Sequence, residues 1–158
     1  MIVLLRLSEK EQPMKYESHI TQSACNAKSI YHVLSNLKSF ERVRNMIPQD
    51  KIQELEIEED YVRVKVNGLG QKIGVFIADK EEEKVVKYGV ENSPIAVTMW
   101  IQMKQVAPQD TRIKVTLDAE IPFMFRMMVE KKLQDGLNQA ADMLAQFPYE
   151  EWEKGDAV

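Results

Sequence analysis

The chain has 158 residues, of which 44% are hydrophobic and 29% are charged, and its formal net charge at pH 7 is -4. This length supports one domain with a buried core and is short for two. The acidic balance argues against nucleic-acid binding, which favours a basic surface. The single cysteine, Cys25, excludes an internal disulfide and a cluster of thiolates around a metal.

The N-terminal segment, residues 1–13, begins with a short apolar run that ends at Arg6. This run is too short for the core of a signal peptide and far too short to span a bilayer, so we expect a cytoplasmic protein without a membrane span. Two interpretations of the segment stay open. It is either an extra edge strand that covers apolar surface, or an upstream extension in which Met14, not Met1, is the biological start.

Residues 15–22 alternate between the two sides of an extended chain, which is the period of a half-buried strand. Tyr16 and Ile20 fall on the inward side of this strand. His19 falls on the other side, so we interpret it as a surface histidine rather than as a catalytic base.

Two short helices are expected next. Asn26 suits the cap of a helix over residues 27–34, where apolar side chains recur at helical spacing. A second helix is predicted over residues 37–46, with Phe40 and Val43 pointing inward, before a proline ends it.

From Ile52 the hydrophobic period changes to two, which predicts an antiparallel meander. The Asn67-Gly68 pair is a strong hairpin signal, because both residues tolerate the positive φ of a type I′ turn. The outward side of the meander carries Phe76 and Trp100. Either Ile2–Leu7 covers these two side chains, or they form a patch for a homodimer. The six predicted strands cover residues 52–58, 62–66, 71–78, 84–90, 95–106 and 112–121.

A long helix is predicted over Pro122–Phe147, because Pro122 suits a first helical position and Pro148 stops a helix. Its later turns carry one apolar stripe that should pack on the sheet. Its first two turns, Phe123–Val129, are apolar nearly all round, which suggests the wall of a pocket. Gly136 lowers helix propensity by about 1 kcal/mol relative to alanine, so we expect a close backbone approach there if it faces the sheet.

This order of elements resembles the START-like or SRPBCC superfamily, which includes the birch-pollen allergen type, polyketide cyclases and dehydrases, and lipid-transfer domains. The resemblance is carried by the strand at Tyr16–Thr21 leading into Ala27–Leu34, by Asn67-Gly68 and by Phe123–Phe147. It implies an α+β helix-grip fold, in which a curved seven-stranded antiparallel sheet wraps around the long C-terminal helix and two short helices separate strands one and two. The implied division is an N-terminal extension at 1–13, the START-like domain at 14–149 and an acidic C-terminal tail at 150–158.

The resemblance also implies a cavity between the sheet and the long helix that holds a hydrophobic or aromatic metabolite or a lipid, for binding or transport. Methionines suit such a cavity because they repack around different guests. Tyr16 and Tyr88 would supply hydroxyls that orient the polar end of a guest. The candidate ligand-binding residues are Tyr16, Ile20, Tyr88, Met99, Met103, Phe123, Met124, Met127 and Met128.

No catalytic residue, metal site or cofactor is predicted. His19 and His32 lie on different elements without further ligands at metal spacing, and Cys25 has no convincing histidine partner in the sequence. We therefore favour a binding protein over an enzyme. Two alternatives stay open. One is an enzyme like a polyketide cyclase or dehydrase, which needs a carboxylate or histidine in the cavity. The other is an interaction module that serves a chaperone, quinone-biosynthesis or ribosome-related partner.

Overall fold

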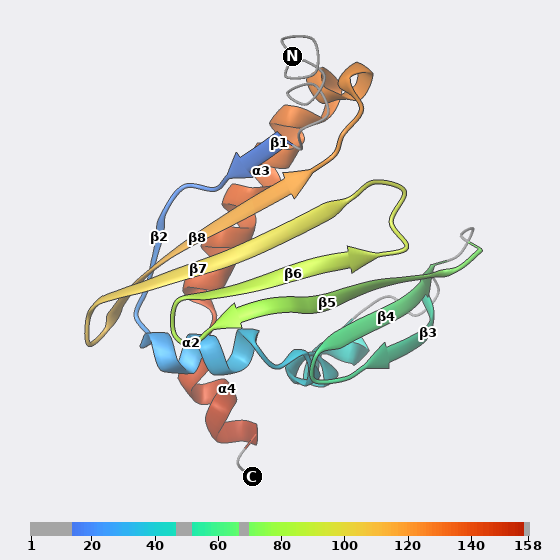
Figure 1. Cartoon of the computed structure of the whole chain (residues 1–158). Coiled ribbons are helices and arrows are strands. Elements are labelled where there is room, and N and C mark those ends of the chain that lie inside the picture. The colour runs from blue at the N-terminus through green and yellow to red at the C-terminus, as the bar shows by residue number, and fades with distance from the viewer. Residues whose placement is uncertain (1–13, 47–51, 67–69, 157–158) are drawn as a thin grey trace.

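The computed structural model describes residues 14–46, 52–66 and 70–156. It has one antiparallel sheet, a long helix on one face of that sheet and shorter helices at one end (Figure 1). The predicted α+β helix-grip fold is confirmed. In the described part of the chain the eight strands are β1 (Met14–Glu17), β2 (Thr21–Ser23), β3 (Ile52–Ile57), β4 (Tyr61–Val66), β5 (Lys72–Glu81), β6 (Val85–Glu91), β7 (Val97–Ala107) and β8 (Asp110–Ala119). The helices are α2 (Ala27–Leu34), the 3-10 helix η1 (Leu37–Met46), α3 (Phe123–Gln146) and α4 (Tyr149–Asp156).

The sheet follows the predicted meander. Its strands pair in the order β1-β8-β7-β6-β5-β4-β3, and β2 pairs with β8 on the same edge as β1. Strands β3 to β8 are therefore neighbours both in the sequence and in space, as short antiparallel connections require. The pair Asn67-Gly68, predicted to turn between β4 and β5, lies outside the described residues.

Strand one differs from the prediction, because it divides into β1 and β2. Residues 18–20 stand opposite only two residues of β8, which is a bulge with one extra residue. Ser18 holds this bulge: its N–H donates to the carbonyl of Val115 at 2.8 Å, and its hydroxyl accepts from the N–H of Val115 at 2.9 Å. An extra residue moves the following side chains to the opposite face, so Ile20 is 66% exposed instead of inward.

The two short helices form where they were predicted. The Asn26 side chain caps α2 by accepting from the N–H of Ser29 at 2.8 Å. Helix η1 has the predicted bounds, but Phe40 is 47% exposed, so its predicted inward orientation is wrong. Phe40 lies at an apolar pocket that η1 forms with α3 and α4, outside the core cluster. The side chain of Val43 lies outside the described residues.

Helix α3 begins after Pro122 and ends before Pro148, as predicted. Its main contacts are with β8, β2 and β1, so it follows one edge of the sheet (Figure 1). Three hydrogen bonds tie it there: Gln134 Nε2 to the Glu17 carbonyl at 2.7 Å, the His19 N–H to Asn138 Oδ1 at 2.9 Å, and Thr21 Oγ1 to the Ala141 carbonyl at 3.0 Å. Gly136 is exposed, and a Cβ on it would meet nothing within 4 Å. The close approach expected at Gly136 is absent because this residue faces away from the sheet.

The core lies where α2, α4 and the end of α3 meet strands β6, β7 and β8. Tyr149, the first residue of α4, is fully buried, and its hydroxyl donates to the carbonyl of Leu144 at 2.6 Å. Glu153 on α4 accepts from the hydroxyl of Ser29 at 2.9 Å. The residues expected to form an acidic tail therefore include a helix that packs on α2. No helix in the described part of the chain is long and apolar enough to cross a membrane.

The outer face of the sheet, opposite α3, carries Phe76 and Trp100 as predicted, and both are half-buried. The ring of Phe76 covers Gly89 on the neighbouring strand, where an added Cβ would lie 2.4 Å from the ring. Trp100 lies between two lysines, with the Nζ atoms of Lys15 and Lys87 each 5.6 Å from its ring centroid. The predicted cover by residues 2–7 lies outside the described residues, and the homodimer through this face remains a prediction.

Candidate functional site

The face of the sheet on which α3 packs is apolar and only partly covered. Because α3 follows the β1–β8 edge, one apolar stripe of a helix is too narrow to cover the central strands as well. Some large apolar side chains of this face are consequently half-buried, whereas others, such as Met103, are buried in the core. The half-buried ones from the sheet are Val62, Val75, Ile77, Val97, Met99 and Leu117, and α3 adds Val129 and Leu133. We call these eight residues the open apolar face.

Tyr16 lies beside the open apolar face on β1, paired with Leu117 on β8. Its side chain is buried, and its hydroxyl has no hydrogen-bond partner in the described structure. Burial raises the pKa of this phenol, the charge of Glu130 raises it further, and Arg126 opposes the shift. These two charges belong to the first turns of α3, so the hydroxyl lies near the start of that helix. A buried polar atom without a partner is uncommon, which makes Tyr16 a candidate for binding a guest.

Tyr88 does not fill the role predicted for it. It is buried on β6, and its hydroxyl donates to the carbonyl of Leu34 at 2.5 Å. Burial raises its pKa above the ordinary value for tyrosine, with a smaller contribution from Tyr149. This phenol already joins the sheet to α2, so we correct its assignment from orienting a guest to holding the fold.

The two predicted methionines of β7 occupy different environments. Met103 is buried in the core opposite Ile113, where it contacts no open space. Met99 is half-buried and pairs with Tyr88 on one side and Leu117 on the other, within the open apolar face. Met99 is therefore the better placed of the two for contact with a guest.

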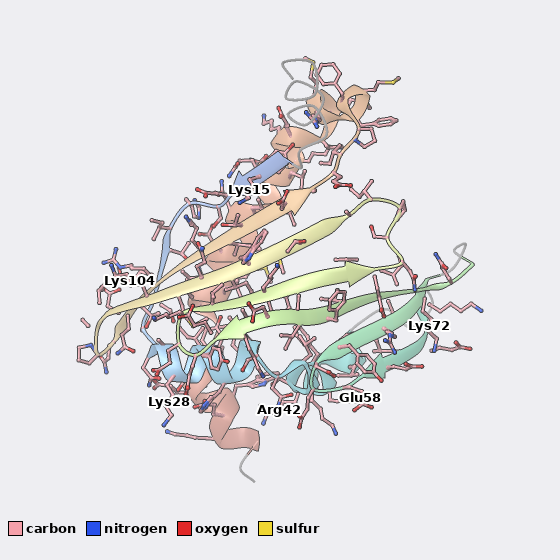
Figure 2. All side chains as sticks on the ribbon, in the orientation of Figure 1. Lys15, Lys28, Arg42, Glu58, Lys72 and Lys104 are labelled. Carbon is pink, nitrogen blue, oxygen red and sulfur yellow. The ribbon has the colours of Figure 1, made fainter. Side chains whose placement is uncertain are left out.

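The predicted pocket wall at the start of α3 is exposed. Figure 1 shows that α3 begins beyond the ends of β1 and β8, and Figure 2 shows sulfur-bearing side chains projecting from it. The sheet ends too early to pack against these turns, so they do not form an enclosed wall. The exposed fractions are 81% for Phe123, 82% for Met124, 91% for Met127 and 71% for Met128, and Ile20 is also exposed because of the bulge.

Of the predicted site residues, Met99 thus lies in the open apolar face and Tyr16 lies beside it. Tyr88 adjoins Met99, but its hydroxyl is bonded to Leu34; Met103 is buried in the core. The remaining predicted residues are exposed.

Leu117 lies in the strand predicted over residues 112–121, Leu133 lies on the apolar stripe of the predicted long helix, and Val129 ends the predicted pocket wall. Their alternation or helical spacing correctly gives the inward side. Periodicity carries no information on whether another element covers that side. It could not predict that these residues are only half-buried.

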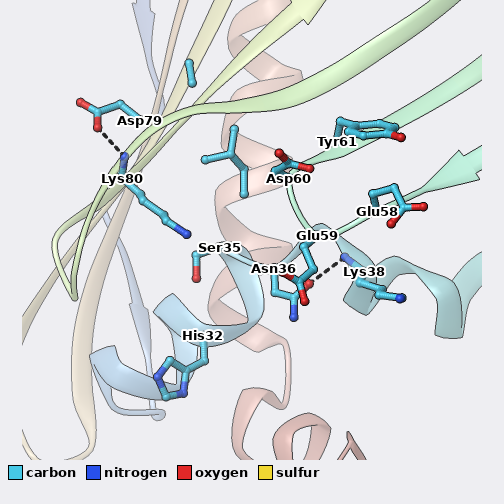
Figure 3. A pocket seen from close by; sticks show the side chains of 12 residues that line it. His32, Ser35, Asn36, Lys38, Glu58, Glu59, Asp60, Tyr61, Asp79 and Lys80 are labelled. Atoms are coloured by element: carbon cyan, nitrogen blue, oxygen red, sulfur yellow. Dashed lines mark hydrogen bonds between the residues drawn. The ribbon is translucent and has the colours of Figure 1, made fainter.

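A polar cleft of about 970 Å³ shares Ile77 with the open apolar face and is otherwise lined by different residues (Figure 3). It is bounded by the end of α2, the start of η1, the β3–β4 turn and β5. Its lining mixes carboxylates with lysines, histidine and an amide (Figure 3). The lining residues are His32, Ser35, Asn36, Lys38, Glu58, Glu59, Asp60, Tyr61, Ile77, Ala78, Asp79 and Lys80.

A smaller apolar pocket of about 250 Å³ lies between α2, η1, the end of α3 and α4. Phe147 and Trp152 line it, with ring centroids 4.9 Å apart, and Arg42 lies over the Trp152 ring at 4.4 Å. The pocket is on the far side of the core from Tyr16. It is formed partly by α4, which the sequence did not predict as a helix.

The titratable residues weighed in the sequence lie outside the open apolar face. His19 Nε2 is 2.7 Å from Asp142, and His32 Nδ1 is 2.9 Å from Glu153, so each histidine joins two elements at the surface. The Cys25 thiol is half-buried and 3.9 Å from the carbonyl of Phe147. Among the described residues, no group of three or more histidine, cysteine or carboxylate side chains could hold a metal ion.

Comparison with known proteins finds the fold among solved structures. No family model and no curated protein matches the chain. Norcoclaurine synthase from Thalictrum flavum is similar over 89% of this chain and 90% of its own, with a TM-score of 0.61 at 14% identity. A START superfamily protein from Mycobacterium smegmatis matches 82% of this chain and 98% of its own, with a TM-score of 0.51 at 15% identity.

A Thermobifida fusca protein solved by NMR is similar over 88% of this chain and 95% of its own, with a TM-score of 0.59 at 10% identity. At such low identities the likeness establishes architecture, and chemistry has to be argued from the site. The chain has the START-like fold that the order of its elements implied.

Proposed function

We propose that this protein binds a small hydrophobic or aromatic molecule, either a metabolite or a lipid, between the open apolar face and α3. The observation that carries this proposal is the buried, unpaired hydroxyl of Tyr16 beside half-covered apolar side chains. A bound guest would remove from water the apolar surface that folding leaves exposed. Each Å² of apolar area buried in this way contributes about 25 cal/mol to the binding free energy. It would also give the phenol a hydrogen-bond partner.

The chemistry of Tyr16 narrows the class of guest. A tyrosine phenol is protonated at neutral pH, and the raised pKa of Tyr16 does not change this, so it can donate to an oxygen acceptor. Met99 and Leu117 offer adaptable apolar contacts beside it. We therefore infer a guest with an apolar body and one carbonyl, ether or hydroxyl oxygen. We propose further that the protein is cytoplasmic and that, where the guest is a lipid, the protein transports it.

The proposal is tested by identifying a bound guest and then blocking its site with a larger side chain. Native mass spectrometry of protein purified from its own host, followed by calorimetry with a panel of fatty acids and aromatic carbonyl compounds, identifies the ligand. Met99→Trp places a large ring in the open apolar face and should weaken binding about tenfold or more. Gln102→Trp is the matched control, because this residue is exposed on the outer face of the same strand.

Two outcomes would contradict the proposal. One is the absence of any bound guest, both from the host and in the ligand panel. The other is equal affinity of the Met99→Trp and Gln102→Trp variants for the same guest, which would place the ligand elsewhere.

The alternative enzymatic function has no specific support in this geometry. Tyr16 and Tyr88 are the phenols on the helix side of the sheet, and burial raises the pKa of both. A phenol with an ordinary pKa near 10 is already protonated at neutral pH, and these shifts make both residues still less suited to act as a general base. The binding function requires only the apolar surface and the hydroxyl that are present.

A further inference from the structure

The start of α3 is an apolar surface without a partner among the described residues. Five large side chains in its first six residues are more than half exposed, and Phe125 at 51% is the least exposed of them. We call Phe123, Met124, Phe125, Met127 and Met128 the apolar helix start. A contiguous patch of this kind usually marks a contact surface, whereas single exposed apolar residues do not.

The N-terminal segment joins the described structure beside this patch. Met14, the first described residue, pairs with Ala119 on β8. Ala119 lies only four residues before Phe123 in the chain, so β1 starts at the same end of the sheet as α3 (Figure 1). Residues 1–13 therefore extend from a point adjacent to the apolar helix start.

The sequence of this segment is complementary to the patch. Residues 2–7 read IVLLRL, in which five of the six side chains are aliphatic and Arg6 carries the charge. Residues 8–13 are polar apart from a terminal proline, and such a linker reaches at most roughly 20 Å. The first two turns of α3 are roughly 10 Å long, which is well within that reach.

We propose that residues 2–7 dock on the apolar helix start of the same chain and cover it. The contact is intramolecular, and a short tether gives the segment an effective concentration in the millimolar range. This is higher than the concentration of a second copy under ordinary conditions, so a segment of the same chain has the advantage over a partner molecule. Docking does not depend on the proposed ligand.

The outer face of the sheet is the competing location for this segment. There Phe76 already covers Gly89, and Trp100 already lies between Lys15 and Lys87. Both aromatic residues are half-buried without further cover, whereas Met127 is 91% exposed. The greater gain in buried apolar area is therefore at the start of α3.

Oxidation of methionines by hydrogen peroxide, followed residue by residue with peptide mass spectrometry, tests the docking in the full-length protein. Met143 on the same helix is the internal reference, because it is 72% exposed and lies near the other end of α3. Exposure in the described residues alone predicts that Met127 oxidises at least as fast as Met143. Docking reverses this order and slows Met127 about tenfold.

The paired variant is Leu4→Asp with Leu5→Asp, which puts two charges in the docking segment. It should restore fast oxidation of Met127 without changing Met143. The matched control, Ser8→Asp with Gln12→Asp, adds the same charge to the linker and should keep Met127 protected.

Three outcomes would overturn the proposal. The first is rapid oxidation of Met127 in the unmodified protein, or protection that persists in the Leu4→Asp, Leu5→Asp variant. The second is protection that disappears on dilution, which would identify a second copy as the partner. The third is protection that appears only with phosphatidylcholine and phosphatidylglycerol vesicles, which would identify a lipid surface.

Discussion

Two tyrosines on the same side of the sheet show how much a single hydrogen bond decides. Tyr88 donates to the carbonyl of Leu34, whereas the buried hydroxyl of Tyr16 has no partner in the described structure. A satisfied buried bond stabilises the fold modestly, and an unsatisfied buried group destabilises it. The two residues therefore have different physical roles, although they look equivalent in the sequence.

Replacing each of these tyrosines by phenylalanine separates the roles. Tyr88→Phe leaves the buried Leu34 carbonyl without its donor and should lower the free energy of unfolding by about 1 to 3 kcal/mol. Tyr16→Phe removes an unpaired hydroxyl, so the free energy of unfolding should stay unchanged or rise by up to about 1 kcal/mol. Urea denaturation of both variants measures the difference.

The affinity for the ligand should respond in the opposite way. Tyr16→Phe should weaken binding of an oxygen-bearing guest by about fivefold to tenfold, because its hydrogen bond is lost. Tyr88→Phe should leave the affinity of the folded protein nearly unchanged. If Tyr16→Phe destabilises the protein as strongly as Tyr88→Phe and binds the guest equally well, the Tyr16 hydroxyl is not a ligand contact.

Among the elements, α3 and the outer face of the sheet use glycine for different reasons. Gly136 lies on the exposed side of α3, and no described neighbour lies within 4 Å of the position that a Cβ would take, so the missing side chain serves no packing purpose. Gly89 on β6 leaves room for the ring of Phe76, whose Cζ would be 2.4 Å from an added Cβ. An aromatic ring over a glycine of the neighbouring strand is a recurrent way to fill that space.

Substitution of the two glycines by alanine should therefore change the free energy of unfolding in opposite directions. Gly136→Ala improves helix propensity and should raise the free energy of unfolding by about 0.5 to 1 kcal/mol. Gly89→Ala forces the Phe76 ring to move and should lower it by about 1 to 3 kcal/mol. Thermal unfolding of the two variants measures both changes, and a destabilised Gly136→Ala protein would show that an element outside the described residues packs on that side of α3.

At the scale of the whole molecule, α4 closes one end of the core. Tyr149 is fully buried, Trp152 packs on Phe147, and Arg42 donates to the carbonyl of Trp152 at 2.8 Å. The helix-grip domain therefore extends beyond the long C-terminal helix. Its opposite end, at the start of α3, lacks such a covering element among the described residues.

Removal of α4 tests whether this helix is needed to close the core. A chain that ends at Pro148 loses the fully buried Tyr149 and the half-buried Trp152. Loss of a large aromatic residue from a core costs about 3 to 5 kcal/mol. Circular dichroism should show a much lower unfolding temperature, or no cooperative transition. Removal of residues 157–158 is the control and should leave the transition unchanged. An equally stable Pro148 truncation would show that α4 is dispensable for the fold.

The outer face also bears on association between molecules. Lys15 and Lys87 flank Trp100 on this face. Light scattering over a range of protein concentrations tests the homodimer predicted through Phe76 and Trp100.

Much of the fold could be predicted from local patterns in the sequence. The alternation in residues 112–121 depends on the period of an extended chain, and the bounds of α3 depend on prolines that lack an N–H and restrict the backbone. The cap at Asn26 is equally local, because its side chain reaches an N–H three residues away. The candidate site was predicted less well, because Tyr16 and Met99 remain in it, while Ile20 and the start of α3 do not.

The sequence by itself determined the order of the elements, their inward sides and hence the helix-grip architecture, because these follow from short-range backbone geometry. Only the tertiary structure decided which inward sides are covered. The bulge at Ser18 turned Ile20 outward, and the hydrogen bonds of α3 to β1 and β2 held that helix at the sheet edge. Coverage depends on contacts between residues more than a hundred positions apart, which a periodic pattern does not encode.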